Sequence, residues 1–425
     1  MATNTATQTL IIGGGIVGVT LALKLALQQQ KVTLIDARPE LSELQWQQKL
    51  QQRDARVFAL SIASIELLKE VGAWQLIAQS GRKADYTQMQ VWQQDGRGEL
   101  NFGDDRVPQL LGSMVEPFVI EQALYQRMAA DDVKEYLTLI AGHKVTMLDW
   151  LGSQQGYQVH LDNGDKLQGK LLIGADGRGS LVRREAGIGL DTLDYNQTAI
   201  CCAIKTEKPH KATARQLMLP TGTLALLPLA DVTEQDKANP QHWQSVVWSL
   251  PRNRALELLQ LNEEDSEETA DTLRRELAAA SQYALGDIEQ LESIASFPLN
   301  AQQAKNYVKD NLVLVGDAAH GVHPLAGQGL NLGMLDVSAL VEILNEDYQR
   351  SGGRCWGELA TLRRYERTRR PHNSMMMHSF SLMNWLFAGD FAALRPVQQL
   401  RSEGMYRVGK IKPLMRFFTN KASGL

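Results

Sequence analysis

Three glycines near the start of the chain, Gly13, Gly15 and Gly18, have the spacing GxGxxG. Glycines at this spacing permit a sharp turn and let the backbone approach a pyrophosphate, and a helix that begins there offers unpaired N–H groups to the phosphate oxygens. Asp36 closes the next apolar run, where its carboxylate can accept a hydrogen bond from a ribose hydroxyl. The pattern predicts a dinucleotide site but does not distinguish FAD from NAD.

A second glycine-rich segment runs from Gly316-Asp317 to Asp336 and includes residues 323–333, HPLAGQGLNLG. A carboxylate that follows a buried strand can bind a ribityl hydroxyl, and glycines allow a flavin ring to lie against bare backbone. The start of the next helix would face flavin N1 and the C2 carbonyl, where negative charge accumulates on reduction. We assign cofactor contacts to Asp317, Gly327, Gly329, Leu330 and Asn331, and the catalytic environment of the flavin ring to Pro324, Gly327 and Gln328.

Further candidates lie between these two segments. Arg56 precedes an apolar helix and offers a planar donor to a phosphate or a flavin edge, although a surface arginine explains the same pattern. Asp176 follows an apolar run and lies among small residues, as close backbone approach to a ligand requires, but a simple turn has the same residues. Gln122, in an expected helix over residues 121–128, completes the predicted cofactor contacts.

The elements that would position these residues follow from the spacing of apolar residues. Residues 9–36 predict one strand, helix and strand unit, which places the glycine loop between a strand and a helix. Alternating runs between residues 198 and 250, together with residues 88–102, predict an antiparallel sheet that serves as the substrate platform. Further strands are expected over residues 144–151, 157–161, 170–173 and 311–315, and a helix over 328–344.

The length of 425 residues suits two domains, one of which interrupts the other. The predicted fold is α/β: a Rossmann-like FAD-binding domain with a parallel sheet, an inserted antiparallel-sheet α+β substrate domain, and a helical C-terminal tail. We assign residues 1–80, 103–185 and 296–370 to the FAD-binding domain, 81–102 and 186–295 to the substrate domain, and 371–425 to the tail.

Composition places the chain among ordinary globular proteins. It has 44% hydrophobic and 22% charged residues, which argues against disorder, and a net charge of -4, which argues against nucleic acid as the principal partner. Three cysteines imply no disulfide framework. The start of the chain lacks the basic region of a signal peptide, and no run reaches the roughly 20 apolar residues of a membrane span. We expect a cytoplasmic protein.

With its motifs in this order, the chain resembles the flavin-dependent aromatic hydroxylases of the para-hydroxybenzoate hydroxylase type, and within them the ubiquinone-biosynthesis hydroxylases. Residues 323–336 match that family's signature, and the Gly13 loop, Asp54-x-Arg56 and Asp176-Gly177 fall in the family's order. The segments most similar to the subtype that hydroxylates C5 of the polyprenylphenol ring are residues 214–216, 224–229, 247–250 and 364–367.

The resemblance implies FAD, reduced by transiently bound NADPH or NADH, capture of O₂ as a flavin C4a-hydroperoxide, and transfer of OH to an electron-rich phenol ring. No residue of the sequence can be assigned as general base. One position departs from the family: relatives carry Val-Glu-Asn where this chain has Val115-Glu116-Pro117, which removes an amide near the expected flavin edge.

Other interpretations stay open. His320 and His323 are three residues apart, but a third ligand is missing, so we expect no metal. A hydroxylase of the same fold that acts on a soluble aromatic acid is the nearest alternative enzyme. A flavin-binding scaffold that holds other quinone-biosynthesis proteins together is the alternative from another class.

The C-terminal tail differs chemically from the rest of the chain. Its last part, residues 395–425, carries seven cations against the single acid Glu403, and aromatic and apolar residues accompany them at Trp385, Leu386, Phe387, Phe417 and Phe418. The cations are Arg395, Arg401, Arg407, Lys410, Lys412, Arg416 and Lys421. Basic and aromatic residues together predict peripheral contact with the inner membrane surface, where a polyprenyl substrate resides. A docked helical segment, or a contact for protein partners, is the alternative interpretation.

Overall fold

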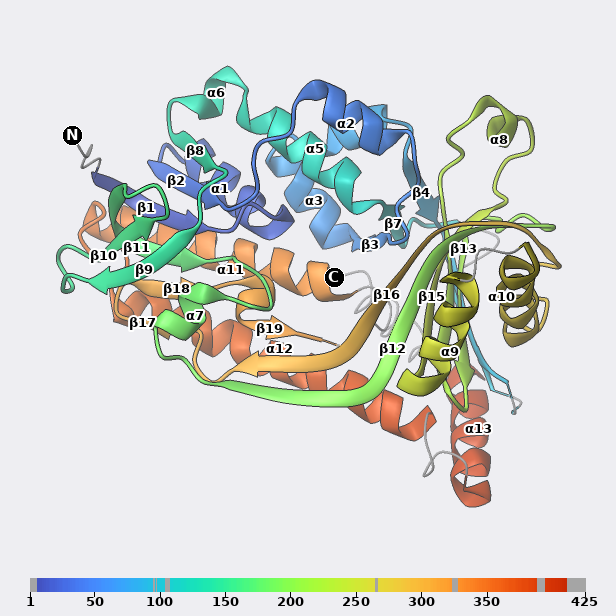
Figure 1. The fold of residues 1–425 in the computed structure, drawn as a ribbon. Coiled ribbons are helices and arrows are strands. Elements are labelled where there is room, and N and C mark those ends of the chain that lie inside the picture. The colour runs from blue at the N-terminus through green and yellow to red at the C-terminus, as the bar shows by residue number, and fades with distance from the viewer. Residues whose placement is uncertain are drawn as a thin grey trace.

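The structure is a computed structural model that describes residues 6–94, 96, 98–103, 108–263, 267–322, 328–387 and 394–410. The strands of the described residues form three sheets. A mainly parallel sheet and its helices make one half of the molecule, a large antiparallel sheet makes the other half, and two long strands run between them (Figure 1).

The parallel sheet contains the first strand of the chain. Its order is β17-β18-β11-β1-β2-β8; β17 pairs with β18 antiparallel, and the hairpin β9–β10 extends β11. The strands β18, β11, β1, β2 and β8 are all parallel to their neighbours in this order. The strand bounds are β1 Ala6–Ile12, β2 Val32–Asp36, β8 Leu137–Ala141, β9 Val145–Trp150, β10 Tyr157–Leu161, β11 Lys166–Gly174, β17 Val308–Lys309 and β18 Leu312–Leu314.

The order of these strands determines where a ligand binds. β1 lies between β2, which follows it in sequence, and β11, which comes much later, so the strand order reverses between β1 and β11. In open parallel sheets, ligands bind outside the carboxyl ends of the strands at such a reversal. That edge brings together Gly13 after β1, Asp36 at the end of β2, Asp176 after β11 and Asp317 after β18.

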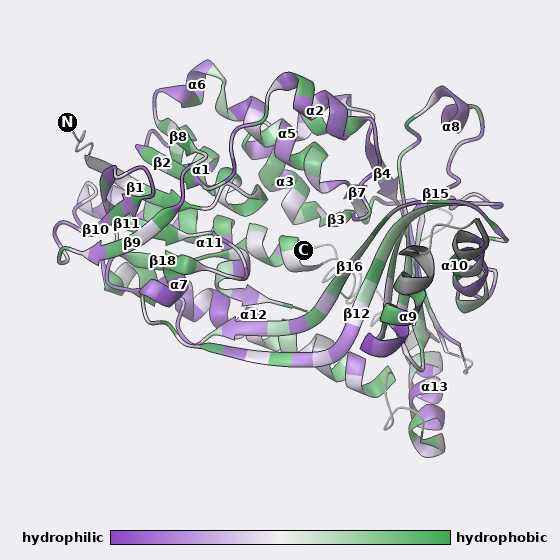
Figure 2. Cartoon of the chain, viewed as in Figure 1, coloured by the Kyte–Doolittle hydropathy of each residue, from purple (hydrophilic) through white to green (hydrophobic). Residues whose placement is uncertain are grey.

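Helices cover this sheet and bury its core. Every residue of β2 is buried, as are nine residues of α1. Hydrophobic residues concentrate in this layer, whereas outlying helices such as α6 and α8 are more hydrophilic (Figure 2). The helices before the inserted sheet are α1 Ile16–Leu27, α2 Glu43–Leu50, α3 Ile62–Glu70, α4 Trp74–Gln79, α5 Pro117–Met128, α6 Asp131–Lys134 and α7 Leu181–Glu185.

The antiparallel sheet has the order β19-β16-β12-β15-β14-β13-β5-β6, with one parallel pair, β13 and β5. One face packs against α9 and α10 through Ile204, Val246 and Leu273, and the other faces the parallel half. The bounds are β5 Gln88–Gln93, β6 Glu99–Phe102, β12 Leu190–Thr206, β13 Thr213–Leu219, β14 Gly222–Pro228, β15 Trp243–Pro251, β16 Ile288–Ala304, β19 His320–Gly321, α8 Glu234–Ala238, α9 Arg252–Glu263 and α10 Glu267–Ala280.

A small third sheet joins the two halves. It consists of β3 (Phe58–Ser61), β7 (Gly112–Val115) and β4 (Lys83–Tyr86), in that order. Its residues Ala59 and Met114 pack on the inner face of the antiparallel sheet. The sequence patterns did not predict this sheet, because three four-residue strands carry too little periodicity to be recognised.

Three helices end the described chain: α11 Gln328–Ser351, α12 Leu359–Phe387 and α13 Arg395–Lys410. Phe387 and Met405 bring the end of α12 and α13 against Val91 and Met218 of the antiparallel sheet. Within the described residues, no helix is both long and apolar enough to cross a membrane.

The predicted fold class is confirmed, whereas the domain boundaries stay predictions. Residues 295 and 296, where one boundary was placed, lie inside the continuous strand β16. The expected helix over residues 121–128 begins earlier, at Pro117. Proline favours the first turn because its φ already suits a helix and its missing N–H has no partner there, so this start could have been read from the sequence.

Candidate cofactor and substrate site

The glycine loop after β1 has the backbone geometry of a pyrophosphate site. Gly13 has a φ of 111°, and a Cβ there would overlap the carbonyl oxygen of Ala175. A Cβ on Gly18 would overlap the carbonyl oxygen of Gly13. Gly15, by contrast, has no heavy atom within 4 Å of its Cβ position, and it begins α1 without a side-chain cap. The N–H groups of the first turn of α1 are therefore available to an anion.

The Asp36 carboxylate lies beside this loop. Its Oδ2 accepts a hydrogen bond from the Gly14 N–H at 2.6 Å, and its Oδ1 accepts one from the Arg38 N–H at 2.7 Å. The Arg38 side chain donates to the Gly14 carbonyl oxygen at 2.9 Å and lies 3.2 Å from Glu121. Asp36 thus stabilises the loop itself. Arg38, which sequence reasoning missed, adds a cation to the same site.

Two adjoining cavities extend along this edge of the sheet. The first, of about 530 Å³, is lined by the glycine loop, Asp36, Arg38 and Asp176. The second, of about 510 Å³, lies between the parallel half and the antiparallel sheet. Gly15, Ala175 and Gly177 line both cavities, so an extended ligand can pass from one to the other.

The two predicted acids at the strand ends differ in their hydrogen bonds. Asp176 accepts from the Ser180 hydroxyl at 2.5 Å and from the Val182 N–H at 3.1 Å, so it orders the start of α7. The Asp317 carboxylate makes no hydrogen bond with the described residues and lines the second cavity. Water reaches it from the cavity, yet protein surrounds it on most sides, so burial raises its pKa despite the opposing charges of His320 and Arg178.

Asp317→Asn is expected to weaken FAD binding about tenfold or more, because a hydrogen bond donated by a hydroxyl to a charged carboxylate contributes about 1.5–3 kcal/mol. A raised carboxyl pKa makes the ionised form unfavourable in the apoprotein, and this cost grows as pH rises through the ordinary Asp pKa. At neutral pH the variant apoprotein should therefore unfold at the same or a higher temperature than wild type. Flavin titration and thermal unfolding at pH 7 check both parts; unchanged FAD affinity would contradict the assignment.

The start of α11, where the sequence predicts cofactor contacts, borders the second cavity. Gly329 and Leu330 line it, and Asn331 is buried. The Asn331 amide accepts from the Ser61 N–H at 3.0 Å and donates to the Ala59 carbonyl at 2.8 Å, which leaves its backbone for a cofactor contact. Pro324 and Gly327, together with the side chain of Gln328, lie outside the described residues, so the proposed flavin-ring environment stays a prediction.

A buried network anchors the loop that precedes α11. Asp336 is fully buried and accepts hydrogen bonds from the Gly316 N–H at 3.1 Å, His320 Nε2 at 2.5 Å and Arg369 Nε at 2.7 Å. Burial alone would raise the pKa of Asp336, but the charges and hydrogen bonds of His320 and Arg369 outweigh it and lower that pKa. His320 is thus held by a carboxylate, and the described residues contain no group of three or more acids, His or Cys placed to hold a metal.

Arg56 and Gln122 occupy different positions relative to the cavities. The Arg56 guanidinium lines the second cavity, 4.8 Å from the centre of the Phe297 ring. Gln122 lies on α5, half-buried, and lines neither cavity. Pro117, the departure from the family pattern, lines the second cavity, while the neighbouring Glu116 is buried and pairs with Arg82 at 2.8 Å.

The antiparallel sheet contributes an uncharged wall to the second cavity. Cys201, Val247 and Ala225 are direct neighbours across β12, β15 and β14. Burial raises the pKa of the Cys201 thiol to about 11, so it is protonated at neutral pH. The wall residues from this sheet are Ala199, Cys201, Ala225, Leu227, Val247, Phe297, Pro298, Leu299, Asn300 and Gly321, and none is charged.

The two arginines that line this cavity are directed to protein partners. Arg178 donates to the Asn300 carbonyl oxygen at 2.7 Å, and Arg56 lies over Phe297. A buried guanidinium, that of Arg183, fixes the Arg178 loop through hydrogen bonds of 2.8 Å to the Arg178 and Ala318 carbonyl oxygens. The role of Arg183 could not be read from the sequence, because its partner Ala318 comes from a distant segment.

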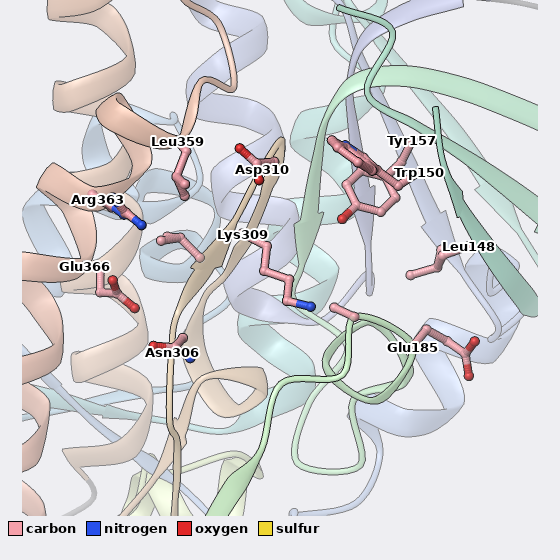
Figure 3. Close-up of a pocket in the computed structure, with 12 residues that line it drawn as sticks. Leu148, Trp150, Tyr157, Glu185, Asn306, Lys309, Asp310, Leu359, Arg363 and Glu366 are labelled. Carbon is pink, nitrogen blue, oxygen red and sulfur yellow. The ribbon is translucent and has the colours of Figure 1, made fainter. Parts of the chain in front are cut away.

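A further cavity of about 510 Å³ lies away from this site, between the β9–β10 hairpin, α7 and α12. Lys309 extends into it, whereas the Glu185 carboxylate points outward (Figure 3). None of its lining residues belongs to the other two cavities, and none was predicted as a site residue.

The residues present fit FAD. The open position at Gly15 and the uncapped start of α1 suit a pyrophosphate, and Asp36 lies where an adenosine ribose would bind. The Asp317 carboxylate, which has no hydrogen-bond partner among the described residues, suits a ribityl hydroxyl. A family model described as an FAD binding domain matches residues 6–379. The 3-demethoxyubiquinol 3-hydroxylase of Escherichia coli is 34% identical over 430 residues and covers 100% of both chains. This chain belongs to the FAD-dependent monooxygenase family.

A second sequence relative and a solved structure are also similar to this monooxygenase over nearly its whole length. The ubiquinone hydroxylase UbiL of Rhodospirillum rubrum is 33% identical over 415 residues, which cover 98% of this chain and 89% of the relative. Among solved structures, p-nitrophenol 4-monooxygenase from Pseudomonas putida superposes with a TM-score of 0.72 at 17% identity and covers 98% of each chain. That likeness confirms the fold of the monooxygenase.

Proposed function

We propose that this monooxygenase hydroxylates the aromatic ring of a polyprenylphenol intermediate in ubiquinone biosynthesis, with NADPH or NADH as reductant and O₂ as oxidant. The observation that carries the proposal is the uncharged wall of the second cavity. A ring that bears a hydroxyl and an apolar tail leaves no charge to be paired there. The names of two full-length relatives, a 3-demethoxyubiquinol 3-hydroxylase and a ubiquinone hydroxylase, support the same substrate class.

The protein's own contribution is to bind and orient. Reduced FAD supplies the activation of O₂. The glycine loop, with Gly13, Gly15 and Gly18, would admit its pyrophosphate. Asp36 and Asp176 would bind its adenosine end, and Asp317 would bind its ribityl chain. Gly329 and Leu330 would border the ring. The position of the ring would be restricted by Pro324, Gly327 and Gln328. Arg56 would contact the outer edge of the ring. Val247 and Leu227 exclude water from the opposite side of the cavity.

A soluble aromatic acid fits this cavity less well. Its carboxylate would need a cation on the wall, because an unpaired buried charge is strongly unfavourable. The wall from the antiparallel sheet carries none, and the two arginines elsewhere in the cavity lining contact protein groups, Arg178 the Asn300 carbonyl oxygen and Arg56 the Phe297 ring. Incubating the holoenzyme with prenylated phenols and with phenolic acids separates the two. We expect only the prenylated phenol to accelerate NAD(P)H oxidation with a matching amount of hydroxylated product; acceleration by the acid instead would contradict the proposal.

The scaffold interpretation has one observation in its favour, Pro117 in the second cavity in place of an amide. The glycine loop and Asp317 nevertheless keep the geometry that FAD needs. A purified yellow protein that turns over no phenol would favour the scaffold.

Two positions of the aromatic ring are candidates for hydroxylation. Residues 214–216 and 224–229, which resemble the C5 subtype, favour C5, whereas the relative from Escherichia coli is named for position 3 of demethoxyubiquinol. Mass spectrometry of the quinone precursors that accumulate in a cell lacking this chain identifies the position. We propose C5 on the sequence segments.

We further propose that the tail contacts the surface of the inner membrane, with other quinone-biosynthesis proteins as neighbours. Leu382 and Trp385 on α12 are 59% and 52% exposed, and the basic residues of the sequence after 394 complement anionic lipid. In a liposome flotation assay, unchanged binding after removal of residues 395–425 would refute this contact.

A further inference from the structure

Two adjacent residues of β16, Phe297 and Pro298, form an apolar margin of the second cavity. Among the described residues that line this cavity, the exposed ones are Arg56, Arg178, Phe297, Pro298 and Asp317. Three of these are charged, whereas Phe297 and Pro298 are apolar. The rest of the wall from the antiparallel sheet is buried or half-buried. The apolar wall of the cavity therefore reaches solvent at Phe297 and Pro298.

The Phe297 side chain belongs both to the cavity and to the surface. Phe297 is paired directly with Ala199, which lines the cavity and is 2% exposed, and directly opposed residues point to the same face of a sheet. Phe297 itself is 36% exposed. The Arg56 guanidinium lies 4.8 Å from the centre of the Phe297 ring, and a cation over a ring face attracts it. This contact holds the Phe297 ring at the margin.

The second cavity is too small for a polyprenyl tail. Its volume of about 510 Å³ lies in the range of sites that hold one small ligand. Under the proposed function this space would hold the flavin ring as well as the phenol ring, so a tail of several prenyl units has to leave it. An apolar chain is stabilised where it covers apolar surface, and it gains nothing by desolvating charged groups. Phe297 and Pro298 offer the apolar surface.

We propose that the prenyl tail of the substrate leaves the second cavity across the ring of Phe297, which makes Phe297 a specificity-determining residue for tail length. This inference rests on the proposed function and deepens it by naming the residue that the tail contacts. The phenol ring and the first prenyl unit bind within the buried wall, and the second prenyl unit packs on Phe297. Affinity therefore rises with the second unit, and Phe297 accounts for that rise.

The paired strand β12 offers a control residue, Leu193. It is 48% exposed, pairs with Ala301 of β16, and is not among the residues that line the cavity. Phe297→Ala and Leu193→Ala each remove an exposed apolar side chain from these two strands, once at the cavity margin and once away from it. Phe297→Leu keeps an apolar side chain but removes the ring over which Arg56 lies.

The test titrates the oxidised holoenzyme with 2-prenylphenol and 2-geranylphenol, which carry one and two prenyl units, and follows the change in flavin absorbance. Wild type should bind 2-geranylphenol about tenfold more tightly, because the second unit buries additional apolar surface. Phe297→Ala should reduce this preference to less than about threefold, while its affinity for 2-prenylphenol changes by less than about twofold. Leu193→Ala should keep the preference, and Phe297→Leu most of it. Phe297→Gln replaces Phe297→Ala if that variant does not hold FAD.

A preference that survives in Phe297→Ala or Phe297→Gln overturns the inference, and so does a wild type that binds both phenols equally, as expected if the tail leaves elsewhere. An equal loss in Leu193→Ala would place the second unit on the outer surface of the strands. An equal loss in Phe297→Leu would assign the effect to the contact with Arg56. Either result also overturns the inference. In each case the proposed function stands if wild type converts 2-prenylphenol to a hydroxylated product; if it hydroxylates neither phenol, the proposed function fails as well.

Discussion

Gly15→Ala is expected to weaken FAD binding about 100-fold, or about 2.7 kcal/mol, while it leaves the apoprotein intact. A Cβ at Gly15 meets no protein atom within 4 Å and points into the space where the pyrophosphate must approach the backbone. The free energy of unfolding of the apoprotein should change by less than about 1 kcal/mol. Alanine is a poorer helix N-cap than glycine, which destabilises the folded state, but it also restricts the unfolded chain, which favours folding. Flavin titration and urea unfolding of the apoprotein measure the two effects.

Gly13→Ala is the matched control, with the opposite pattern. Its φ of 111° and the overlap of a Cβ with the Ala175 carbonyl oxygen strain the protein itself. We expect the apoprotein to lose about 2 kcal/mol or more, with FAD binding lost as a consequence. If Gly15→Ala retained normal FAD affinity, the pyrophosphate would not lie at this loop.

Asp336→Ala is expected to have the largest effect on stability, a loss of about 3–5 kcal/mol in the free energy of unfolding. Asp336 is fully buried, and its removal leaves the Arg369 guanidinium, itself 6% exposed, without its carboxylate. The Gly316 N–H and His320 would lose their acceptor too, so the loop before α11 should loosen and FAD affinity should fall. Urea unfolding of the apoprotein at pH 7 gives the first quantity.

Glu346→Ala, on the same helix α11, is the control for Asp336→Ala. Glu346 pairs with Arg364 in a partly exposed position, so its loss should cost less than about 1 kcal/mol. The lowered pKa of Asp336 makes its effect on stability depend on pH. The ionised carboxylate contributes fully to the free energy of unfolding above the ordinary Asp pKa, and this contribution is lost as pH falls through the pKa of Asp336 in the folded protein. The gap between wild type and Asp336→Ala should therefore narrow below about pH 4. Equal losses in the two variants would contradict the role of Asp336 as anchor.

The parts of the site that could be predicted are those fixed by the backbone. Gly13 must be glycine because its φ and the nearness of Ala175 allow no side chain, and that requirement is visible as spacing in the sequence. Asp36 and Asp317 end or follow buried strands, and the parallel order of those strands brings them to one edge. Local pattern and sheet topology therefore suffice for the cofactor half.

The wall that the antiparallel sheet contributes to the second cavity could not be predicted, because the register between neighbouring strands creates it. Cys201, Val247 and Ala225 become neighbours only once β12, β15 and β14 pair, and no spacing in the sequence encodes this row. Arg38 differs, because it follows Asp36 by two residues and could have been noticed as a second charge beside the loop.

We propose that this flavoprotein inserts one oxygen atom from O₂ into the ring of a prenylated phenol. Incubating the purified holoenzyme with NADPH or NADH, a prenylated phenol and isotopically labelled dioxygen tests it directly by mass spectrometry of the product. We predict one labelled oxygen on the aromatic ring, in an amount that matches the nicotinamide oxidised. Nicotinamide oxidation that yields only hydrogen peroxide, or ring oxygen that comes from water, would contradict the account.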